Sequence, residues 1–489
     1  MENNKKKHTG SNILIILLIL IILASTGVGL YSWAKYRTTV EGTATGEIAK
    51  WNFNVTDGNS QTEAIDFTVT RTDNNESVAK DKMAPGTYGI VEIGIDATGT
   101  ETALTYIIEG EVSNLPTNLK LYSNEERTEE IIIVNNKFSY GGYMSLQEIG
   151  KRAEKIYWEW PFETGETAAE KTANNKIDTE DSGKTMNMNI TVTGRQVNGE
   201  PRLADLVQIG DYVNYDASSN GTYTFANADW QAGSRVLKYE GENAVETTIS
   251  TNEVFNSEAP AQWRVLSIDR KAGTVDLVAI NPTTQIVELS GGDGFVNGET
   301  VLKNIGAIYG HGKGASSGRS IKMSDIEQYS SYDKSTYQND SGLGNYGIKL
   351  DFTSGNFYKE KTDSNGNVIG YESNVTVAGT GDSKITMTQT RYHYRPKSYM
   401  YSSKIYDLLM NKDYWLASAT AGLGDGYVAY YIQKIYVNET GHTVFGSGKL
   451  CNSRDQVWTE EANVLPVVTL NTNIQTTGQE SNGVWQLDV

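Results

Sequence analysis

The sequence contains few of the residues from which disulfides, zinc sites and nucleic-acid-binding surfaces are built. Its 489 residues include one cysteine, Cys451, and four histidines. A single cysteine excludes an intramolecular disulfide and a zinc site held by several cysteines. The His-Glu-x-x-His signature of the commonest zinc proteases is absent. Lysines and arginines number 42 against 60 acidic residues, and the resulting charge of −18 argues against a nucleic-acid partner.

A hydrophobic segment near the N-terminus is the strongest positive signal. Residues 13–24 are apolar without interruption, and small or weakly polar residues extend the run to Leu30. As a helix, residues 13–30 would measure roughly 27 Å, which is close to the thickness of a bilayer core. Lysines 5–7 precede the segment, so the positive-inside rule predicts that the chain after residue 30 lies outside the cytoplasm.

Two outcomes are open for this leader. The small residues at 24–27 are typical of a cleaved signal peptide, whereas Tyr31 and Trp33 are typical of the exit from a permanent membrane anchor. We therefore predict a signal peptide or membrane anchor over residues 1–30, with the membrane as a partner through residues 13–30. The predicted localisation is the cell membrane, facing outwards, or the cell surface after secretion.

Alternating apolar and polar residues predict strands in most of the remaining chain. In residues 65–70 every second residue is apolar, which is the pattern of a half-buried strand. Comparable apolar-rich runs occur at 90–95, 104–109 and 188–193. Helix is expected only in short pieces, of which residues 146–156 are the best candidate. The predicted fold is therefore mainly β, beginning with an antiparallel sandwich.

Several motifs follow the leader in a fixed order. They are Gly42–Gly46, Ile48–Phe53, the turn Ala84–Gly86, the loop Leu115–Leu119 and Trp158–Pro161. In this order residues 31–197 resemble the camelysin/TasA family of exported Gram-positive matrix proteins. The resemblance implies a jelly-roll-like β-sandwich over residues 31–200. It also implies a role in a biofilm matrix, where some members form fibres when one subunit's N-terminal strand completes its neighbour's sheet.

Residues 38–55 are the donor strand that such an assembly would use. They directly follow the leader, and an open sheet edge presents backbone groups that an added strand can satisfy. The alternative is that this segment is an ordinary first strand, paired within its own domain. Both interpretations remain open at the level of sequence.

The sequence offers no catalytic residues that we can assign. One member of the resembled family has been classed as a protease, an activity that would need converging metal ligands or an activated nucleophile. Histidines 311, 393 and 442 are scattered, and no Gly-x-Ser-x-Gly elbow is present. A Ser-His-Asp triad stays open, because its members need not be close in sequence. We predict a protein that is not an enzyme and needs neither a metal nor a cofactor.

A second β-rich unit begins near Arg202. Its clearest element is a hairpin made by residues 263–269 and 275–279. Short capped helices are predicted at 324–327 and 402–410. This pattern predicts a β-rich unit with a few short helices.

Two motifs near the C-terminus carry a second resemblance. Tyr414–Ser418 reads Tyr-Trp-Leu-Ala-Ser, and Val464–Val468 reads Val-Leu-Pro-Val-Val. The pair resembles bacterial surface domains related to the C-type-lectin and formylglycine-generating-enzyme fold, although Leu465 occupies the usual Arg position. The resemblance implies a β-rich α+β domain over residues 203–489. The enzymatic branch of that fold uses a cysteine pair, and the tripeptides of calcium-dependent sugar binding are absent here, so neither activity is implied.

Tyrosines concentrate in this second unit. Of 29 tyrosines, 8 precede residue 200 and 29 − 8 = 21 follow it. Tyrosine combines a large contact area with a polar tip, which suits a binding surface. The candidate binding residues are Tyr392, Tyr394, Tyr427, Tyr430 and Trp415; the alternative is that these side chains only cover sheet faces.

Together these features predict a non-enzymatic structural or interaction protein of the cell surface or extracellular matrix. Its predicted partners are the membrane, itself or other matrix proteins through strand exchange, and a surface ligand. Two other functions stay open, a ligand-binding adhesin and a cell-surface hydrolase. An adhesin predicts an exposed aromatic patch in the second unit, and a hydrolase predicts a pocket with converging acids or a metal.

Overall fold

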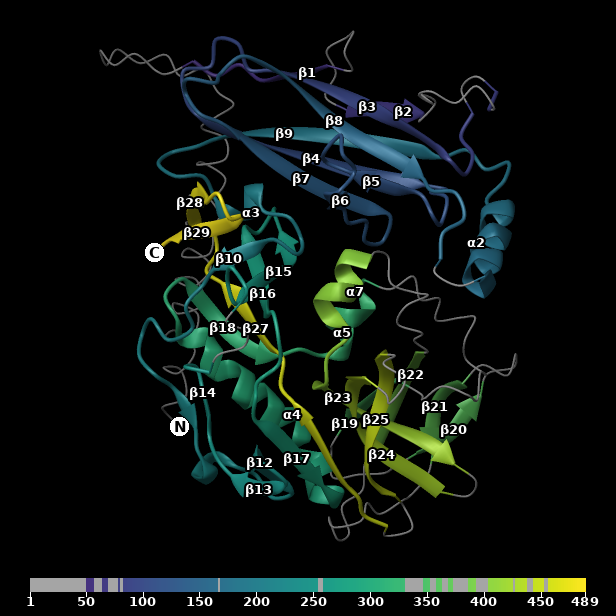
Figure 1. Cartoon of the computed structure of the whole chain (residues 1–489), viewed down its shortest axis with the longest axis vertical. Coiled ribbons are helices and arrows are strands. Elements are labelled where there is room, and N and C mark those ends of the chain that lie inside the picture. The colour runs from purple at the N-terminus through teal and green to yellow at the C-terminus, as the bar shows by residue number, and fades with distance from the viewer. Residues whose placement is uncertain are drawn as a thin grey trace, which may run out of the picture. The chain divides into compact units, whose positions relative to one another are not determined.

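A computed structural model describes residues 50–56, 64–68, 78–79, 82–165, 168–253, 258–329, 346–351, 358–362, 368–372, 386–392, 403–424, 427–437, 443–452 and 456–489. Residues 50–489 belong to one compact unit. The fold is mainly β and contains several sheets, as the sequence predicts (Figure 1). In the described ranges no helix has the length and apolar character needed to cross a membrane. The predicted leader at 13–30 lies outside these ranges.

The first part is a two-layered antiparallel sandwich. One sheet has the order β1-β3-β8-β5-β6 and the other the order β2-β9-β4-β7. The strands are β1 (Asn54–Thr56), β2 (Ala64–Thr68), β3 (Thr87–Asp96), β4 (Leu104–Ser113), β5 (Lys120–Tyr122), β6 (Glu130–Ile131), β7 (Lys137–Met144), β8 (Lys151–Trp160) and β9 (Asn187–Gln196). The four strands predicted in this part correspond to β2, β3, β4 and β9, although residues 69–70 of the first lie outside the described ranges.

The helix predicted at 146–156 is wrong. Residues 151–160 form β8, which pairs with all ten residues of β3. Ile156, Trp158 and Trp160 are buried in alternation, so the period along this segment is that of a strand. Pairing and burial in a sheet override the weak helical pattern of the first residues. The described residues of this part form the helix α2 (Ala168–Glu180), whose sequence is mostly polar.

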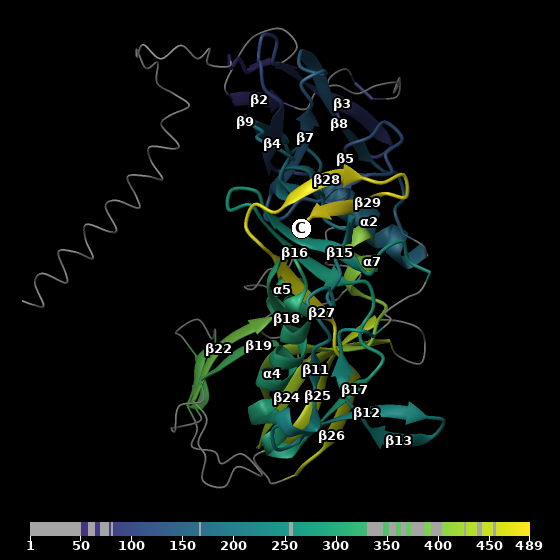
Figure 2. The ribbon, with the colours of Figure 1, turned by 90° about the vertical axis from the view of Figure 1, so that its left-hand side faces the viewer.

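The second part contains the remaining sheets. A seven-stranded sheet has the order β18-β27-β16-β15-β10-β29-β28, a four-stranded sheet the order β13-β12-β17-β26 and a three-stranded sheet the order β23-β24-β25. Three pairs complete the described strands, β11-β14, β19-β22 and β20-β21. The β12-β13 hairpin projects from its sheet in Figure 2.

The bounds of its elements are as follows. The strands are β10 (Tyr212–Asn214), β11 (Thr224–Phe225), β12 (Ser234–Glu240), β13 (Asn243–Glu246), β14 (Ile249–Ser250), β15 (Trp263–Asp269), β16 (Thr274–Ala279), β17 (Ile286–Ser290), β18 (Ala315–Ser320), β19 (Tyr346–Asp351), β20 (Tyr358–Thr362), β21 (Val368–Glu372), β22 (Thr386–Tyr392), β23 (Tyr414–Gly424), β24 (Tyr427–Val437), β25 (Thr443–Asn452), β26 (Thr459–Asn463), β27 (Pro466–Leu470), β28 (Gln475–Gln479) and β29 (Val484–Asp488). The helices are α3 (Leu203–Leu206), η1 (Asn227–Asp229), α4 (Gly291–Ala307), η2 (Ile308–His311), α5 (Met323–Glu327) and α7 (Ser403–Leu409).

Two predictions for this part, the hairpin and the short helices, are confirmed. The predicted hairpin is β15-β16, antiparallel and with a register shift after Val265. The predicted short helices are α5 and α7. The two C-terminal motifs lie side by side, because Trp415 and Val464 form a parallel β-bridge. The long helix α4 was not predicted.

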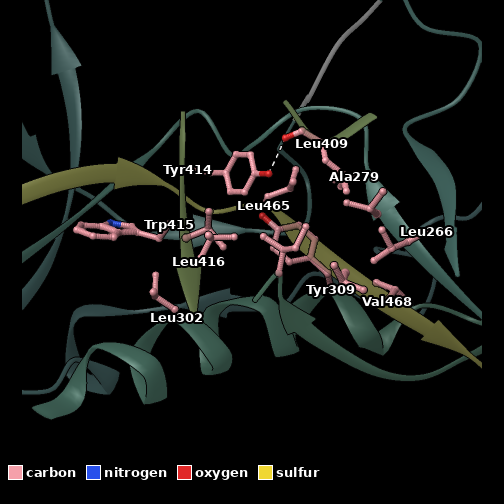
Figure 3. Packing of buried hydrophobic residues seen from close by; sticks show 14 of the residues in the cluster. Leu266, Ala279, Leu302, Tyr309, Leu409, Tyr414, Trp415, Leu416, Leu465 and Val468 are labelled. Atoms are coloured by element: carbon pink, nitrogen blue, oxygen red, sulfur yellow. Dashed lines mark hydrogen bonds between the residues drawn. The ribbon is translucent and has the colours of Figure 1, made fainter. Parts of the chain in front are cut away.

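Two hydrophobic clusters form within the compact unit. One contains residues between Val55 and Val192, and the other contains residues between Leu203 and Ile474 together with Ile132 of the first part. In the second cluster α4 packs beneath β-strand residues, with Leu302 below Leu416 and Trp415, and the Tyr414 hydroxyl donates to Leu409 O at 2.6 Å (Figure 3). The predicted domain boundary at residues 200–203 remains a prediction, since both clusters belong to the same unit.

Candidate functional site

In the described ranges β3 lies between β8 and the short strand β1, at one side of the first sheet. β8 pairs with β3 along its whole length, whereas β1 pairs only with Gly94, Ile95 and Asp96. Within the described ranges, Thr87–Ile93 therefore have a strand neighbour on one side only. A strand at the edge of a sheet presents alternate backbone N–H and C=O groups with which an added strand can pair. The strand itself is firmly anchored, because every second residue of β3 is buried.

The predicted donor segment 38–55 overlaps this edge at its C-terminal end. Residues 38–49 lie outside the described ranges, but Asn54 and Val55 belong to β1 and pair with β3 of the same chain. The Phe53 ring lies against Gly194 of β9, where a Cβ would come within 2.6 Å of the ring. At its described end the segment therefore packs on its own sandwich, and its role as a donor stays a prediction.

A buried arginine joins the two parts. Arg270 follows β15 and is 4% exposed. Its guanidinium donates to Ser139 Oγ at 2.9 Å and Ser139 O at 3.2 Å in β7, to Val207 O at 2.9 Å, and to Ala204 O. Burial lowers the pKa of Arg270 to about 10, while the charge of Asp205 opposes this shift. The side chain remains charged near neutral pH and links β7 to the segment around α3.

Asp205 forms the second half of this junction. It is almost completely buried and accepts hydrogen bonds from Thr105 Oγ1 of β4 at 3.1 Å and from Arg202 Nε at 3.0 Å. Arg195 of β9 lies 3.5 Å from its other oxygen. Gly141 of β7 also approaches closely, since a Cβ there would lie 2.0 Å from Asp205 O. Polar contacts and backbone packing therefore fix this face of the sandwich against the second part.

A cavity of about 470 Å³ lies beside the junction. On β4, Glu109 stands between Ser139 and Thr191, and Glu111 stands between Lys137 and Asn189. The opposite wall comes from the second part and is lined by Gln208, Ile209, Ser267, Ile268, Gln328 and Tyr329. The cavity thus combines two carboxylates and the Lys137 ammonium with neutral polar and apolar groups.

Two of the five predicted binding residues belong to the core. Trp415 and Tyr430 are fully buried. The Trp415 indole donates to Val287 O at 2.8 Å, and the Tyr430 ring lies 5.0 Å from that of Phe295 in α4. The assignment of Trp415 and Tyr430 to an exposed binding surface is therefore not supported, because strand pairing turns both side chains inward.

The other three predicted binding residues stay predictions. Tyr392 ends β22 and pairs with Tyr346, and Tyr427 begins β24 and pairs with Gly424. Tyr394 lies outside the described ranges. Strand pairing therefore places the backbones of Tyr392 and Tyr427 in two different sheets.

Other chemically reactive residues are dispersed. His311 stacks on Tyr223 with ring centroids 3.7 Å apart. Cys451 is buried, which raises the pKa of its thiol to about 12. Among the described residues, no group of three or more His, Cys, Asp or Glu side chains could hold a metal ion.

Protein-family models and curated proteins include no match for this chain.

A partly buried lysine after α7 makes the free energy of unfolding depend on pH. Lys412 Nζ donates to Leu408 O at 2.6 Å. Burial and, to a lesser extent, the charge of Arg264 lower the pKa of Lys412 from 10.5 to about 7, with Asp407 acting in the opposite direction. Between these two values the unfolded chain binds more protons than the folded chain, so the free energy of unfolding should rise with pH.

We expect this rise to disappear in Lys412→Met. From pH 7 to 9 the wild type should gain up to about 1 kcal/mol per pH unit relative to the variant, the full linkage being discounted for partial exposure. Urea unfolding at several pH values measures the difference, and Lys322→Met, at an exposed lysine, serves as the control. Parallel pH profiles for wild type and Lys412→Met would show that Lys412 keeps its proton on folding.

Proposed function

We propose that this protein is a non-enzymatic structural or interaction protein of the cell surface or extracellular matrix, and that it assembles by strand addition at the edge of β3. The observation that supports the proposal is the position of the donor segment's C-terminal end, because Asn54 and Val55 pair with one end of β3 at the edge of the sheet. The incoming strand is residues 38–55 of a second copy or a strand of another matrix protein. Residues 13–30 bring the chain to the membrane, from which the rest is exported.

The chemistry of the edge supports this mode of assembly. Backbone pairing requires no particular side chain, and each added hydrogen bond contributes about 0.5–1.5 kcal/mol. The rigid connection through Arg270 and Asp205 would let a fibre of sandwiches present the second part at fixed intervals.

We further propose a jelly-roll-like topology for the sandwich and a C-type-lectin-like one for residues 203–489; the bridge between Trp415 and Val464 supports the latter.

Removal of residues 31–50 should abolish assembly. The mature chain, residues 31–489, is expected to form fibres visible by electron microscopy, whereas residues 51–489 should stay monomeric, because the donor is lost and the described sandwich is kept. Equal melting temperatures for the two proteins would show that the fold is intact. Fibres formed by residues 51–489 would rule out this donor.

A synthetic peptide of residues 38–55 provides a matched second test. It should cap the edge and inhibit fibre growth by the mature chain. The same peptide with Ile48→Pro should inhibit poorly, because proline lacks the backbone N–H that a paired strand donates. Equal inhibition by the two peptides would contradict strand addition.

One observation favours a second candidate, a cell-surface hydrolase. Glu109 and Glu111 occupy alternate positions on β4 and line the same cavity. Alternate strand residues are about 7 Å apart, within the range of carboxylate pairs that hydrolyse glycosidic bonds. Release of reducing sugars from bacterial polysaccharides, lost in both Glu109→Gln and Glu111→Gln, would establish this function and overturn the non-enzymatic one.

A further inference from the structure

The C-terminal end of α2 holds a buried carboxylate with an unpaired oxygen. Asp178 is 7% exposed. Its Oδ1 accepts hydrogen bonds from Trp160 Nε1 and Asn118 Nδ2, both at 2.9 Å. Its Oδ2 is buried and has no hydrogen-bond partner among the described residues. A carboxylate oxygen withdrawn from water without a partner costs several kcal/mol, so this atom indicates a missing positive or hydrogen-donating partner.

A second buried carboxylate lies one turn further along. Asp181 is 5% exposed, and its Oδ2 accepts the backbone N–H of Thr117 at 2.7 Å. Its Oδ1 lies 2.5 Å from Lys184 Nζ. Asp181 directly follows α2, and both carboxylates accept hydrogen bonds from the loop that carries Thr117 and Asn118. Lys184 balances one of the two negative charges.

The position of Asp178 and Asp181 at the C-terminal end of α2 adds to the excess of negative charge. The C-terminal end of a helix carries a partial negative charge from its unpaired carbonyl groups, which favours cations there and disfavours anions. The last turn of α2 contains no basic residue. Two buried carboxylates lie at the negative end of the helix, and Lys184 pairs with one of them. About one negative charge is therefore left without compensation.

We infer that this end of α2 binds a divalent cation of the calcium type, held by Asp178 Oδ2 and Asp181 together with oxygens of the loop 115–118. The available ligands are carboxylate, amide and carbonyl oxygens, which Ca²⁺ prefers and which zinc does not select. Asn118 donates its amide hydrogens to Asp178, and its amide oxygen accepts no hydrogen bond from any described residue. With two carboxylates the site is weakly charged, so its dissociation constant should resemble that of extracellular calcium modules, on the order of 10⁻⁴–10⁻³ M.

Terbium luminescence tests the site directly, because Trp160 donates a hydrogen bond to Asp178 and lies close enough to sensitise a bound Tb³⁺. We expect tryptophan excitation of the full chain to give Tb³⁺ emission that Ca²⁺ displaces. Trp160→Phe should remove most of the emission while the Ca²⁺-dependent rise in melting temperature persists. Asp178→Asn should weaken Ca²⁺ binding by more than about tenfold, since it removes one of the two charged ligands.

Glu180→Gln is the matched control, because Glu180 lies in the same helical turn with an exposed side chain. It should retain both the Tb³⁺ signal and the response to Ca²⁺. The proposal is overturned if Ca²⁺ and Tb³⁺ produce no response, if Asp178→Asn leaves the response unchanged, or if Glu180→Gln weakens it equally. It is also overturned if Asp178→Asn raises the melting temperature equally with and without Ca²⁺, because the carboxylate would then have no bound cation to compensate it.

Discussion

Replacing Arg270 with methionine should lower the free energy of unfolding by about 3–5 kcal/mol, the range seen when one partner of a buried charged network is removed. Methionine fills a similar volume but donates no hydrogen bond. The carbonyl oxygens of Ala204 and Val207 would lose their guanidinium donors, and buried Asp205 would lose a nearby positive charge. Each orphaned buried acceptor costs about 1–3 kcal/mol, so the total depends mainly on how much water enters the junction.

Urea unfolding followed by tryptophan fluorescence measures this loss. Lys271→Met is the control, because Lys271 is the next residue and is exposed, and we expect a change within about 0.5 kcal/mol. The difference between Arg270→Met and wild type should be constant from pH 6 to 9, since the pKa of Arg270 is about 10 and the side chain stays charged in that range. A loss below about 1 kcal/mol would mean that the junction contributes little to stability.

The junction also bears on assembly. Arg270 and Asp205 contact β4, β7 and β9, which form one sheet of the sandwich, whereas β1 and β3 lie at one side of the other sheet. A strand added at β3 would therefore extend the layer that does not carry the junction. The proposed assembly can thus proceed without disturbing the contacts that fix the second part.

The strands of the sandwich were predictable because local pattern and burial agree there. In β3 and β9 every second residue of much of the strand is buried, and the same alternation is visible in the sequence. The order of the strands was not predictable. β3 pairs with β8, which is more than fifty residues away, and nothing in either segment specifies that partner.

The candidate sites were harder to foresee for a related reason. Trp415 and Tyr430 lie in strands, and an aromatic residue in a strand can face either the core or solvent without a change in local pattern. Arg270 lies in a loop after a strand, and arginines in loops are usually solvated. Its burial follows from hydrogen bonds to Ser139 and Ala204, which are distant in sequence. The partners that define these sites lie too far away in sequence to leave a local signal.

The helix α4 was missed because its glycines contradict the usual preference for helix formers. Five of its 17 residues are glycine, and each costs about 1 kcal/mol relative to alanine in a helix. The packing explains Gly306, which lies against the backbone of β18. A Cβ at this position would lie 2.0 Å from the Arg319 carbonyl carbon and 2.1 Å from Ser320 N. Close approach of helix and strand outweighs helix propensity here.

Gly306→Ala should therefore destabilise the protein, although alanine is the better helix former. The gain of about 1 kcal/mol in propensity is outweighed by overpacking against a backbone that cannot rotate away, and we expect a net loss of about 3 kcal/mol. Asn304→Ala introduces the same residue two positions earlier, at an exposed position of the same helix, and should raise stability by about 0.5 kcal/mol. Urea unfolding of both variants should give changes of opposite sign. A gain in both would mean that β18 moves aside at little cost, and that the glycine is not required by the contact between helix and strand.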